Sequence, residues 1–388
     1  MNSSYGKMKL KQILSCLCLL VLCGCGQVEQ KLPDSVYGMW FSYLDYEEMF
    51  HGQDEKEMQA DLTAAVENMR DLGVNTVYIH ACAFTDAFYA SDIYPRTASL
   101  PGIDYDPLAL FAGAAHQAGL QAEAWINPLR SVAVGEEGNL PEDSQIRIWI
   151  ERNDERVRQV NGRWYLNPAY PEVRSLVVSV VREVLDRYDV DGIHFDDYFY
   201  PEGADRRFDA YVFGLAADAE DISRESFRTA QINALVQEVH AVCAEHDKRF
   251  TISTAGNMEN NLTLYYADPA AWVEAGTVDI LIPQIYWGYG HPVKPYAETL
   301  DEWLAVTAES DVMLAAGLAA YKIGTEDQWA GNAASEWVDS DDMLARQTRT
   351  ALEKGCVGAA YFRYGSLFAT DNQNAAGEIS HLRDEIRK

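Results

Sequence analysis

Two adjacent acidic residues follow an apolar run in the middle of the chain. The stretch 190–201 reads VDGIHFDDYFYP, so Asp196 and Asp197 end a predicted strand and precede three aromatic residues. Two adjacent like charges at the end of a buried strand cost free energy, and this cost favours a functional role for them. Paired carboxylates can act as general acid and as base or nucleophile in hydrolysis. Asp196 is the first candidate for a catalytic carboxylate, and Asp197 is a candidate for the second.

The pleat of this strand predicts different directions for the two carboxylates. Ile193 and Phe195 fall on one face, while His194 and Asp196 fall on the other. If the apolar face packs on helices, Asp196 points toward the axis of a barrel, at its rim. Asp197 then opens the following loop, where a cap or an ion pair would equally explain it.

A third acidic candidate, Glu123, lies in the predicted strand 120–127, LQAEAWIN. Glu123, Trp125 and Asn127 share one face, opposite an apolar face, and lead to Arg130. A glutamate inside a barrel has a raised pKa unless it finds a partner, and a raised pKa suits a general acid. Glu123 is therefore either the second catalytic carboxylate or a structural carboxylate paired with His194 or an arginine.

Other strand ends bring amides and aromatic rings to the same rim. Sugars are held by such a mixture, because rings stack on their C–H faces and polar groups bind their hydroxyls. The predicted substrate-binding residues are Trp40, His80, Asp86, Tyr89, Trp125, Asn127, Arg130, His194, Tyr198, Asn257, Gln284, Tyr286, Trp287, Tyr321 and Arg363. Strand two also places Cys82 at the rim, and strand eight contributes Arg363 or Tyr364. No stretch of the sequence looks like an HExxH site, a nucleotide site or a Ser-His-Asp triad, and we expect no metal and no organic cofactor.

The elements that must position these residues alternate along the chain. Strand-like segments are predicted at 37–44, 74–81, 120–127, 190–196, 249–255, 278–286, 312–321 and 357–364, with amphipathic helices between several of them. Eight strands alternating with helices predict a single-domain (β/α)8 TIM barrel over residues 36–388. A doubly wound sheet is the alternative, but no glycine-rich phosphate loop follows the first strand. Long segments at 82–107, 128–166, 197–224 and 256–277 follow strands, on the side where barrels keep their active sites.

Charge and the N-terminus indicate where the protein acts. The 388 residues carry 60 acidic and 31 basic side chains, a formal charge of −29, which disfavours nucleic acid and anionic membrane surfaces as partners. Residues 1–24 resemble a lipoprotein signal peptide, because lysines precede a short apolar run that ends in Leu22-Cys23-Gly24-Cys25. We expect lipidation at Cys25, a tether over 25–35 and an extracytoplasmic location, anchored to the bacterial cell membrane. The three remaining cysteines predict neither a disulfide framework nor a zinc site.

The ordered set of motifs resembles one known family. The stretches DAFYASDIYP (86–95), AWINPLR (124–130), YLNPAYPEVR (165–174), VDGIHFDDYFYP (190–201) and VDILIPQIYWGY (278–289) are similar to those of the glycosyl-hydrolase-like 10 family, over roughly residues 36–370. The resemblance implies a glycosidase-type barrel in a bacterial envelope lipoprotein. It also implies hydrolysis of the glycan of peptide-free peptidoglycan.

Two positions depart from known patterns. Relatives usually carry a basic residue where this chain has Cys82, which favours the alternative of a non-catalytic, glycan-binding lipoprotein on a degenerate barrel. Chitinase-like barrels, which the stretch around Asp196 also resembles, place a glutamate acid where this chain has Tyr198. A glycan deacetylase is a third reading, which the absence of a paired-histidine metal motif disfavours.

Overall fold

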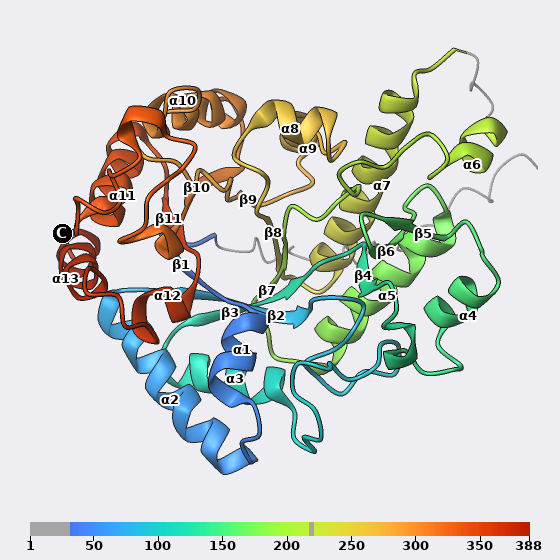
Figure 1. Ribbon diagram of the computed structural model, residues 1–388, viewed down its shortest axis with the longest axis horizontal. Helices are drawn as coiled ribbons and strands as arrows, with labels where there is room; N and C mark the ends of the chain where they lie inside the picture. Colours follow the sequence, from blue (N-terminus) through green and yellow to red (C-terminus); the bar gives the residue numbers. More distant parts are fainter. Residues whose placement is uncertain (1–31, 217–220) are drawn as a thin grey trace, which may run out of the picture. The chain divides into compact units, whose positions relative to one another are not determined.

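The computed structural model describes residues 32–216 and 221–388, which contain a closed barrel of eight parallel strands (Figure 1). Around the barrel the order is β1-β11-β10-β9-β8-β7-β3-β2. Their bounds are β1 (Val36–Phe41), β2 (Thr76–Cys82), β3 (Gln121–Ile126), β7 (Gly192–Phe195), β8 (Arg249–Ile252), β9 (Ile280–Leu281), β10 (Met313–Leu318) and β11 (Gly358–Tyr361). Each overlaps one predicted strand, so the (β/α)8 fold class is confirmed. The predicted signal peptide, Cys25 and tether residues 25–31 lie outside the described residues.

Helices follow most of the strands. The longer ones are α1 (Tyr43–Phe50), α2 (Glu55–Leu72), α3 (Pro107–Gln117), α5 (Pro171–Arg187), α7 (Arg224–Glu245), α10 (Tyr296–Thr307), α11 (Met343–Lys354) and α13 (Ala375–Ile386). Shorter ones are α4 (Gln145–Glu151), α6 (Ala210–Leu215), α8 (Met258–Thr263), α9 (Pro269–Ala275) and α12 (Tyr364–Phe368), with 3-10 turns η1 (Glu137–Asn139), η2 (Ala320–Lys322) and η3 (Gly331–Ala333). No described helix is long and apolar enough to cross a membrane.

Helix α2 illustrates how the sequence specifies these elements. Its apolar positions recur at helical spacing, and Leu62, Ala65 and Met69 are fully buried. Asp54 caps its first turn by accepting from the Glu57 N–H. Gly73 ends it with φ +109°, a left-handed conformation that glycine adopts without strain.

The sixth barrel strand is shorter than predicted. The sequence predicts a strand over 278–286, but regular pairing covers only Ile280–Leu281. Pro283 has no N–H to donate to a neighbouring strand, which interrupts the ladder. Pairing resumes at Gln284, whose N–H donates to the Thr254 carbonyl at 2.9 Å. The strand thus still delivers Gln284 to the barrel mouth.

The barrel separates two apolar layers. The side chains inside it include Val36, Trp40, Tyr78, Trp125, Ile280, Ile282, Ala315 and Ala360. The larger core lies between the strands and the helices, and contains the alternating partners Ala122, Ala124, Ile193 and Phe195. The predicted inward and outward faces of strands three and four therefore agree with the structure.

The long segment 128–166 folds into a small sheet that the sequence did not predict. Strands β4 (Arg130–Ala133), β6 (Arg163–Leu166) and β5 (Val157–Val160) pair antiparallel in that order. Figure 1 shows this sheet, with α4, on the flank of the barrel away from α11 and α13. It follows β3, and its first strand begins at Arg130, one of the predicted site residues.

Candidate active site

The two adjacent aspartates meet at the mouth of the barrel, after β7. Asp196 is 7% exposed, and its Oδ1 accepts hydrogen bonds from the Asp197 N–H at 2.8 Å and from Gln284 Nε2 at 2.6 Å. The two carboxyl groups are also hydrogen-bonded to each other. The prediction that they point in different directions was therefore wrong. Regular strand structure ends at Phe195, and beyond it the pleat no longer determines side-chain direction.

The contact between the carboxyls decides how they ionise. Burial raises the pKa of both groups, and the negative charge of Asp196 raises the pKa of Asp197 further. Two hydrogen-bond donors, the Asp197 N–H and Gln284, stabilise the ionised form of Asp196. The two carboxyls therefore titrate as a pair, in which ionisation of one group makes ionisation of the other less favourable.

Arg130 supplies the positive charge nearest to this pair. It lowers the pKa of both carboxyls, although none of its described contacts is an ion pair. Its guanidinium lies 4.2 Å from the centre of the Tyr198 ring and 4.9 Å from that of Phe84. Tyr198, which occupies the position of the glutamate acid in chitinase-like barrels, thus supports Arg130 at the edge of the site.

Aromatic rings also gather at the mouth. Tyr286 lies 5.7 Å from Tyr321 and 6.1 Å from Phe362, measured between ring centroids. Phe362 also lies 6.1 Å from Trp40 and 6.4 Å from Trp125, so it connects the floor to the rim. The sequence analysis missed Phe362 and selected Arg363 or Tyr364 instead. Phe362 lies two positions after the inward-facing Ala360, and side chains two positions apart on a strand point the same way, so the alternation could have identified it.

A polar network lies below the mouth, inside the barrel. The Trp40 indole N–H donates to His194 Nε2 at 2.9 Å. The ring proton of His194 is therefore on Nδ1, which donates to Thr251 Oγ1 at 2.8 Å. The Thr251 hydroxyl donates to Glu123 Oε2 at 2.6 Å, and Arg249 forms an ion pair with Glu123 at 2.9 Å. Burial lowers the pKa of His194 to about 3, so this histidine is neutral.

Glu123 is thereby separated from the aspartate pair. It pairs in register with Gly192, four residues before Asp196 along β7, which corresponds to about 13 Å of strand. Burial raises the pKa of Glu123, and Arg249 acts against that rise. Of the two readings the sequence left open, the geometry favours a structural carboxylate paired with an arginine.

The upper floor consists of His80, Trp125 and Asn127. The His80 and Trp125 rings stack with centroids 3.7 Å apart, and the Trp125 N–H donates to Asn127 Oδ1 at 3.0 Å. The Asn127 amide also donates to the Ala83 carbonyl at 3.2 Å. These side chains are at most 3% exposed, so they shape the floor beneath the aspartates.

Four of the predicted substrate-binding residues are engaged elsewhere. Asp86 accepts from the backbone N–H groups of residues 83 and 84, and Tyr89 donates to Glu183 on α5 at 3.1 Å. Asn257 caps α8, and Arg363 pairs with Asp45 and Glu48 at 2.6 Å each. The structure does not bring their polar groups to the aspartate pair. Trp287 is half-buried and packs against Gly256. Position 256 has no room for a side chain, because a Cβ there would lie 2.2 Å from the carbonyl oxygen of Gln284.

Cys82 also differs from the expected rim position. The register between β2 and β3 shifts between His80 and Cys82, which turns Cys82 away from the barrel interior. It is fully buried in the outer core, with its sulfur 3.9 Å from the Tyr89 hydroxyl. The residue type at position 82 therefore has no direct contact with the mouth.

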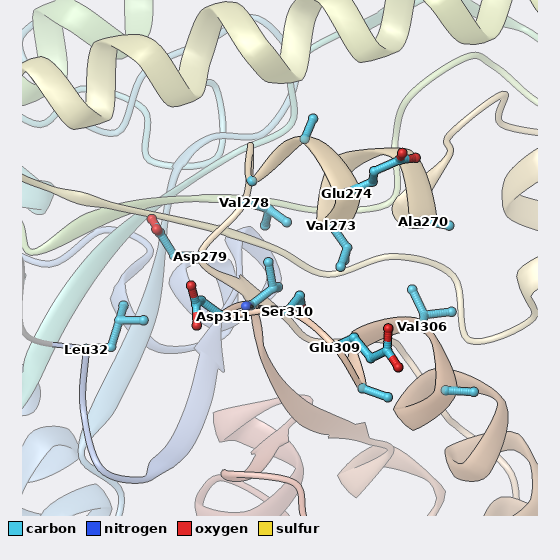
Figure 2. A pocket seen from close by; sticks show the side chains of 15 residues that line it. Leu32, Ala270, Val273, Glu274, Val278, Asp279, Val306, Glu309, Ser310 and Asp311 are labelled. Atoms are coloured by element: carbon cyan, nitrogen blue, oxygen red, sulfur yellow. Dashed lines mark hydrogen bonds between the residues drawn. The ribbon is translucent and has the colours of Figure 1, made fainter.

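A hollow of about 900 Å³ lies at the other end of the barrel (Figure 2). Residues that precede β9 and β10 line it, among them Asp279 and Asp311, together with Glu274 and Glu309. Barrel active sites form at the carboxyl ends of the strands, so we place the candidate site at Asp196. Within residues 32–216 and 221–388, no group of three or more His, Cys, Asp or Glu side chains could hold a metal ion.

Sequence comparison finds relatives that are named as glycosyl hydrolases. Glycosyl hydrolase YngK of Bacillus subtilis (strain 168) is 28% identical over 364 residues, which cover 86% of this chain and 68% of YngK. Glycosyl hydrolase DigH of Escherichia coli O6:H1 is 28% identical over 322 residues, which cover 74% of this chain and 73% of DigH.

Similar solved structures are glycosidase-type barrels. The glycoside hydrolase domain of PgaB (BpsB) from Bordetella bronchiseptica aligns with 91% of this chain and 98% of its own, with a TM-score of 0.60 and 14% identity. The endo-1,4-beta-mannanase of Rhizomucor miehei aligns with 92% and 96%, with a TM-score of 0.55 and 11% identity. At these identities the likeness concerns the fold. The family model "Glycosyl hydrolase-like 10" matches residues 35–339, and the chain therefore belongs to that family.

Proposed function

We propose that the protein is a glycoside hydrolase that cleaves a β-linked, N-acetylated glycan, of the kind found in peptide-free strands of the bacterial cell wall. The observation that carries this proposal is the pair of adjacent carboxyls at the barrel mouth, held by Gln284 and raised in pKa by burial, with a further rise at Asp197 from the charge of Asp196. A glycosidase needs a protonated carboxyl to release the leaving group and an ionised group beside it.

The closeness of the pair favours a particular mechanism. Carboxyls about 5–5.5 Å apart suit a carboxylate nucleophile, and a separation of about 6.5–9.5 Å leaves room for a water. Groups in hydrogen-bond contact fit neither arrangement, but they fit attack by the substrate's own acetamido group. Asp197 would protonate the glycosidic oxygen, the bond from C1 to that oxygen would break as the acetamido oxygen bonds to C1, and the released sugar would leave with a free hydroxyl. Asp196 would accept a hydrogen bond from the acetamido N–H.

The second half of the reaction follows from the same groups. A water attacks C1, the bond to the acetamido oxygen breaks, and the water's proton returns to Asp197. The product keeps the configuration of the substrate at C1, because C1 is inverted twice. Tyr286, Phe362 and the 44%-exposed ring of Tyr321 would stack on the sugars.

The rival reading of a non-catalytic glycan-binding protein loses its sequence support. It was based on Cys82 at a usually basic position, but Cys82 faces the outer core. The carboxyl pair, Gln284 and Arg130 meet without any contribution from it. Catalysis is therefore the better conclusion from the described geometry.

The test is incubation of the purified protein with peptide-free glycan strands. We expect oligosaccharides with new reducing ends, and the first-formed anomer, followed by NMR, should show retention. Asp196→Asn should abolish release, while Asp86→Asn, in a turn that follows β2, should not. Glycan binding without any release would favour the non-catalytic reading, and acetate release would favour a deacetylase.

We also propose that the protein is anchored outside the cytoplasmic membrane through a lipid on Cys25. The support is the N-terminal sequence, in which Lys7, Lys9 and Lys11 precede an apolar run that ends at Cys25. Radiolabelled fatty acid should be incorporated into the protein and should be lost in Cys25→Ala. Label that persists in the variant would contradict the proposal.

A further inference from the structure

One tryptophan of the chain differs from all the others in its exposure. The chain has nine tryptophans, every one of them within the described residues, and eight are buried or half-buried. Trp329 is 74% exposed. Tryptophan is usually among the most buried residues, because its large apolar ring is unfavourable in water. The exposed ring of Trp329 is therefore a candidate contact for a ligand.

The backbone holds this tryptophan in a fixed turn. The Ala330 N–H donates to the Asp327 carbonyl at 2.9 Å, and the Asp327 N–H donates to the Ala334 carbonyl at 2.9 Å. The Asp327 carboxylate accepts from the Trp329 N–H at 3.1 Å and from Lys322 Nζ at 2.6 Å. Asp327 is 4% exposed, so water does not compete for these bonds. A ring presented on such a turn binds a ligand with little loss of conformational entropy.

The turn lies on the same side of the barrel as the aspartate pair. It belongs to the segment 319–342, which follows the carboxyl end of β10. In this segment the Tyr321 N–H donates to the Phe362 carbonyl at 3.2 Å, among the rings that gather at the mouth. Burial, and then the charge of Asp327, raise the pKa of Tyr321 to about 12. The same carboxylate thus adjoins both Tyr321, at the mouth, and the turn that carries Trp329.

The surroundings of the ring suit a sugar better than a protein or a membrane. Gln328 and Asn332 flank it in the sequence and are exposed, and their amides can bind sugar hydroxyls. A protein interface needs a broader apolar centre than one ring. A membrane surface would favour basic side chains, whereas the exposed charged residue next to the turn, Glu326, is acidic.

We propose that Trp329 stacks on a sugar of the same glycan strand, at a distal subsite beyond the rings of the mouth. This inference rests on the proposed glycosidase function and defines its substrate as a strand long enough to reach from Asp196 to Trp329. The sugars next to the scissile bond contact Tyr286 and Tyr321, and the strand continues over the turn. The protein therefore prefers long strands to short oligosaccharides.

The experiment measures binding in the Asp196→Asn protein, so that no cleavage is required. A short and a long oligosaccharide of the same peptide-free, N-acetylated glycan are titrated. We expect about tenfold tighter binding of the long probe. Trp329→Ala should remove this preference and leave the affinity for the short probe unchanged, while Trp329→Phe, which keeps a ring, should retain part of it. The matched control is Val338→Ala, which shortens a 40%-exposed side chain of the same segment and should keep the full preference.

Quenching of tryptophan fluorescence by acrylamide measures the contact directly. Trp329 supplies most of the quenchable signal, because the other eight tryptophans are buried or half-buried. The long probe should protect it, and the short probe and vesicles of phosphatidylethanolamine and phosphatidylglycerol should not. Equal affinity for both probes would overturn the inference. So would an undiminished preference in Trp329→Ala, or protection by the vesicles alone.

These outcomes remain separable from those that test the proposed function. Cleavage by the wild-type protein with the same dependence on strand length as Trp329→Ala would refute only the inference. A preference for the long probe that depends on Trp329, without any cleavage by the wild-type protein, would refute only the hydrolase.

Discussion

The floor and the mouth of the barrel both hold carboxylates that are buried or half-buried, yet the groups that surround them differ in charge. On the floor, Glu123 has Arg249 and Thr251 as partners and is 1% exposed. At the mouth, Asp196 and Asp197 have each other and Gln284, and their nearest positive charge makes no ion pair with them. The position along neighbouring strands thus separates the acid paired with an arginine from the two acids that we propose as catalytic. A satisfied carboxylate stabilises the fold, whereas a repelling pair keeps a proton available.

The largest effect should come from removing the mouth pair. In Asp197→Asn the proton donor is lost, so kcat on a peptide-free glycan should fall by about 10² to 10⁴-fold. The free energy of unfolding should not decrease, because a repulsion is removed. If kcat stayed within tenfold of the wild-type value, Asp197 would not be the acid.

The floor should respond in the opposite way, through stability. Glu123→Leu leaves Arg249 buried without a counter-charge and should lower the free energy of unfolding by about 3–5 kcal/mol, measured by urea denaturation. The double variant Glu123→Leu/Arg249→Met should recover most of this loss, since no charge stays unpaired. A Glu123→Leu protein of normal stability but without activity would instead place Glu123 in the chemistry.

A smaller effect tests the hydrogen bonds of the floor. Thr251→Val removes the hydroxyl between His194 and Glu123 and should cost about 1–3 kcal/mol in thermal or urea unfolding. Thr254→Val is the matched control, because its buried hydroxyl has no described partner and its loss should be nearly neutral. Equal costs for both variants would mean that the network contributes no more than packing.

The smallest effect concerns pH. A carboxyl with a raised pKa binds its proton more tightly in the folded state, so stability falls as pH rises from the unfolded pKa through the folded one. Asp197→Asn should therefore be more stable than the wild type at pH 8 but not at pH 3. The gain should stay below about 1 kcal/mol, since Asp197 is half-buried and water screens its charge. A gain of equal size at both pH values would argue against this titration.

Activity should also depend on pH through the same pair. It should fall at high pH as Asp197 loses its proton, and at low pH as Asp196 gains one. Both limbs should lie above the ordinary pKa of an aspartate, because burial raises the pKa of both groups. The pH profile of kcat/KM measures this, and a low-pH limb near pH 3.8 would contradict it.

The sequence by itself determined the barrel and most of its inner faces. Its eight apolar segments, the helical stripe of α2 and the alternation in β3 and β7 reflect local periodicities that burial enforces. These patterns correctly predict that Trp125, His194 and Asp196 point inward. They also identified Gln284, which contacts Asp196 although the two residues lie 88 positions apart in the sequence.

Only the tertiary structure decided what lies beyond regular strands. The contact between Asp196 and Asp197, the outward turn of Cys82 and the sheet that pairs the strands of Arg130 and Arg163 all occur where the pleat ends or shifts. The partner of Glu123 is Arg249, 126 positions away, and no local pattern links them. Periodicity indicates which face of a strand or helix a residue occupies. The partner that determines its charge and role comes from a segment that is distant in the sequence and that the folded barrel places beside it.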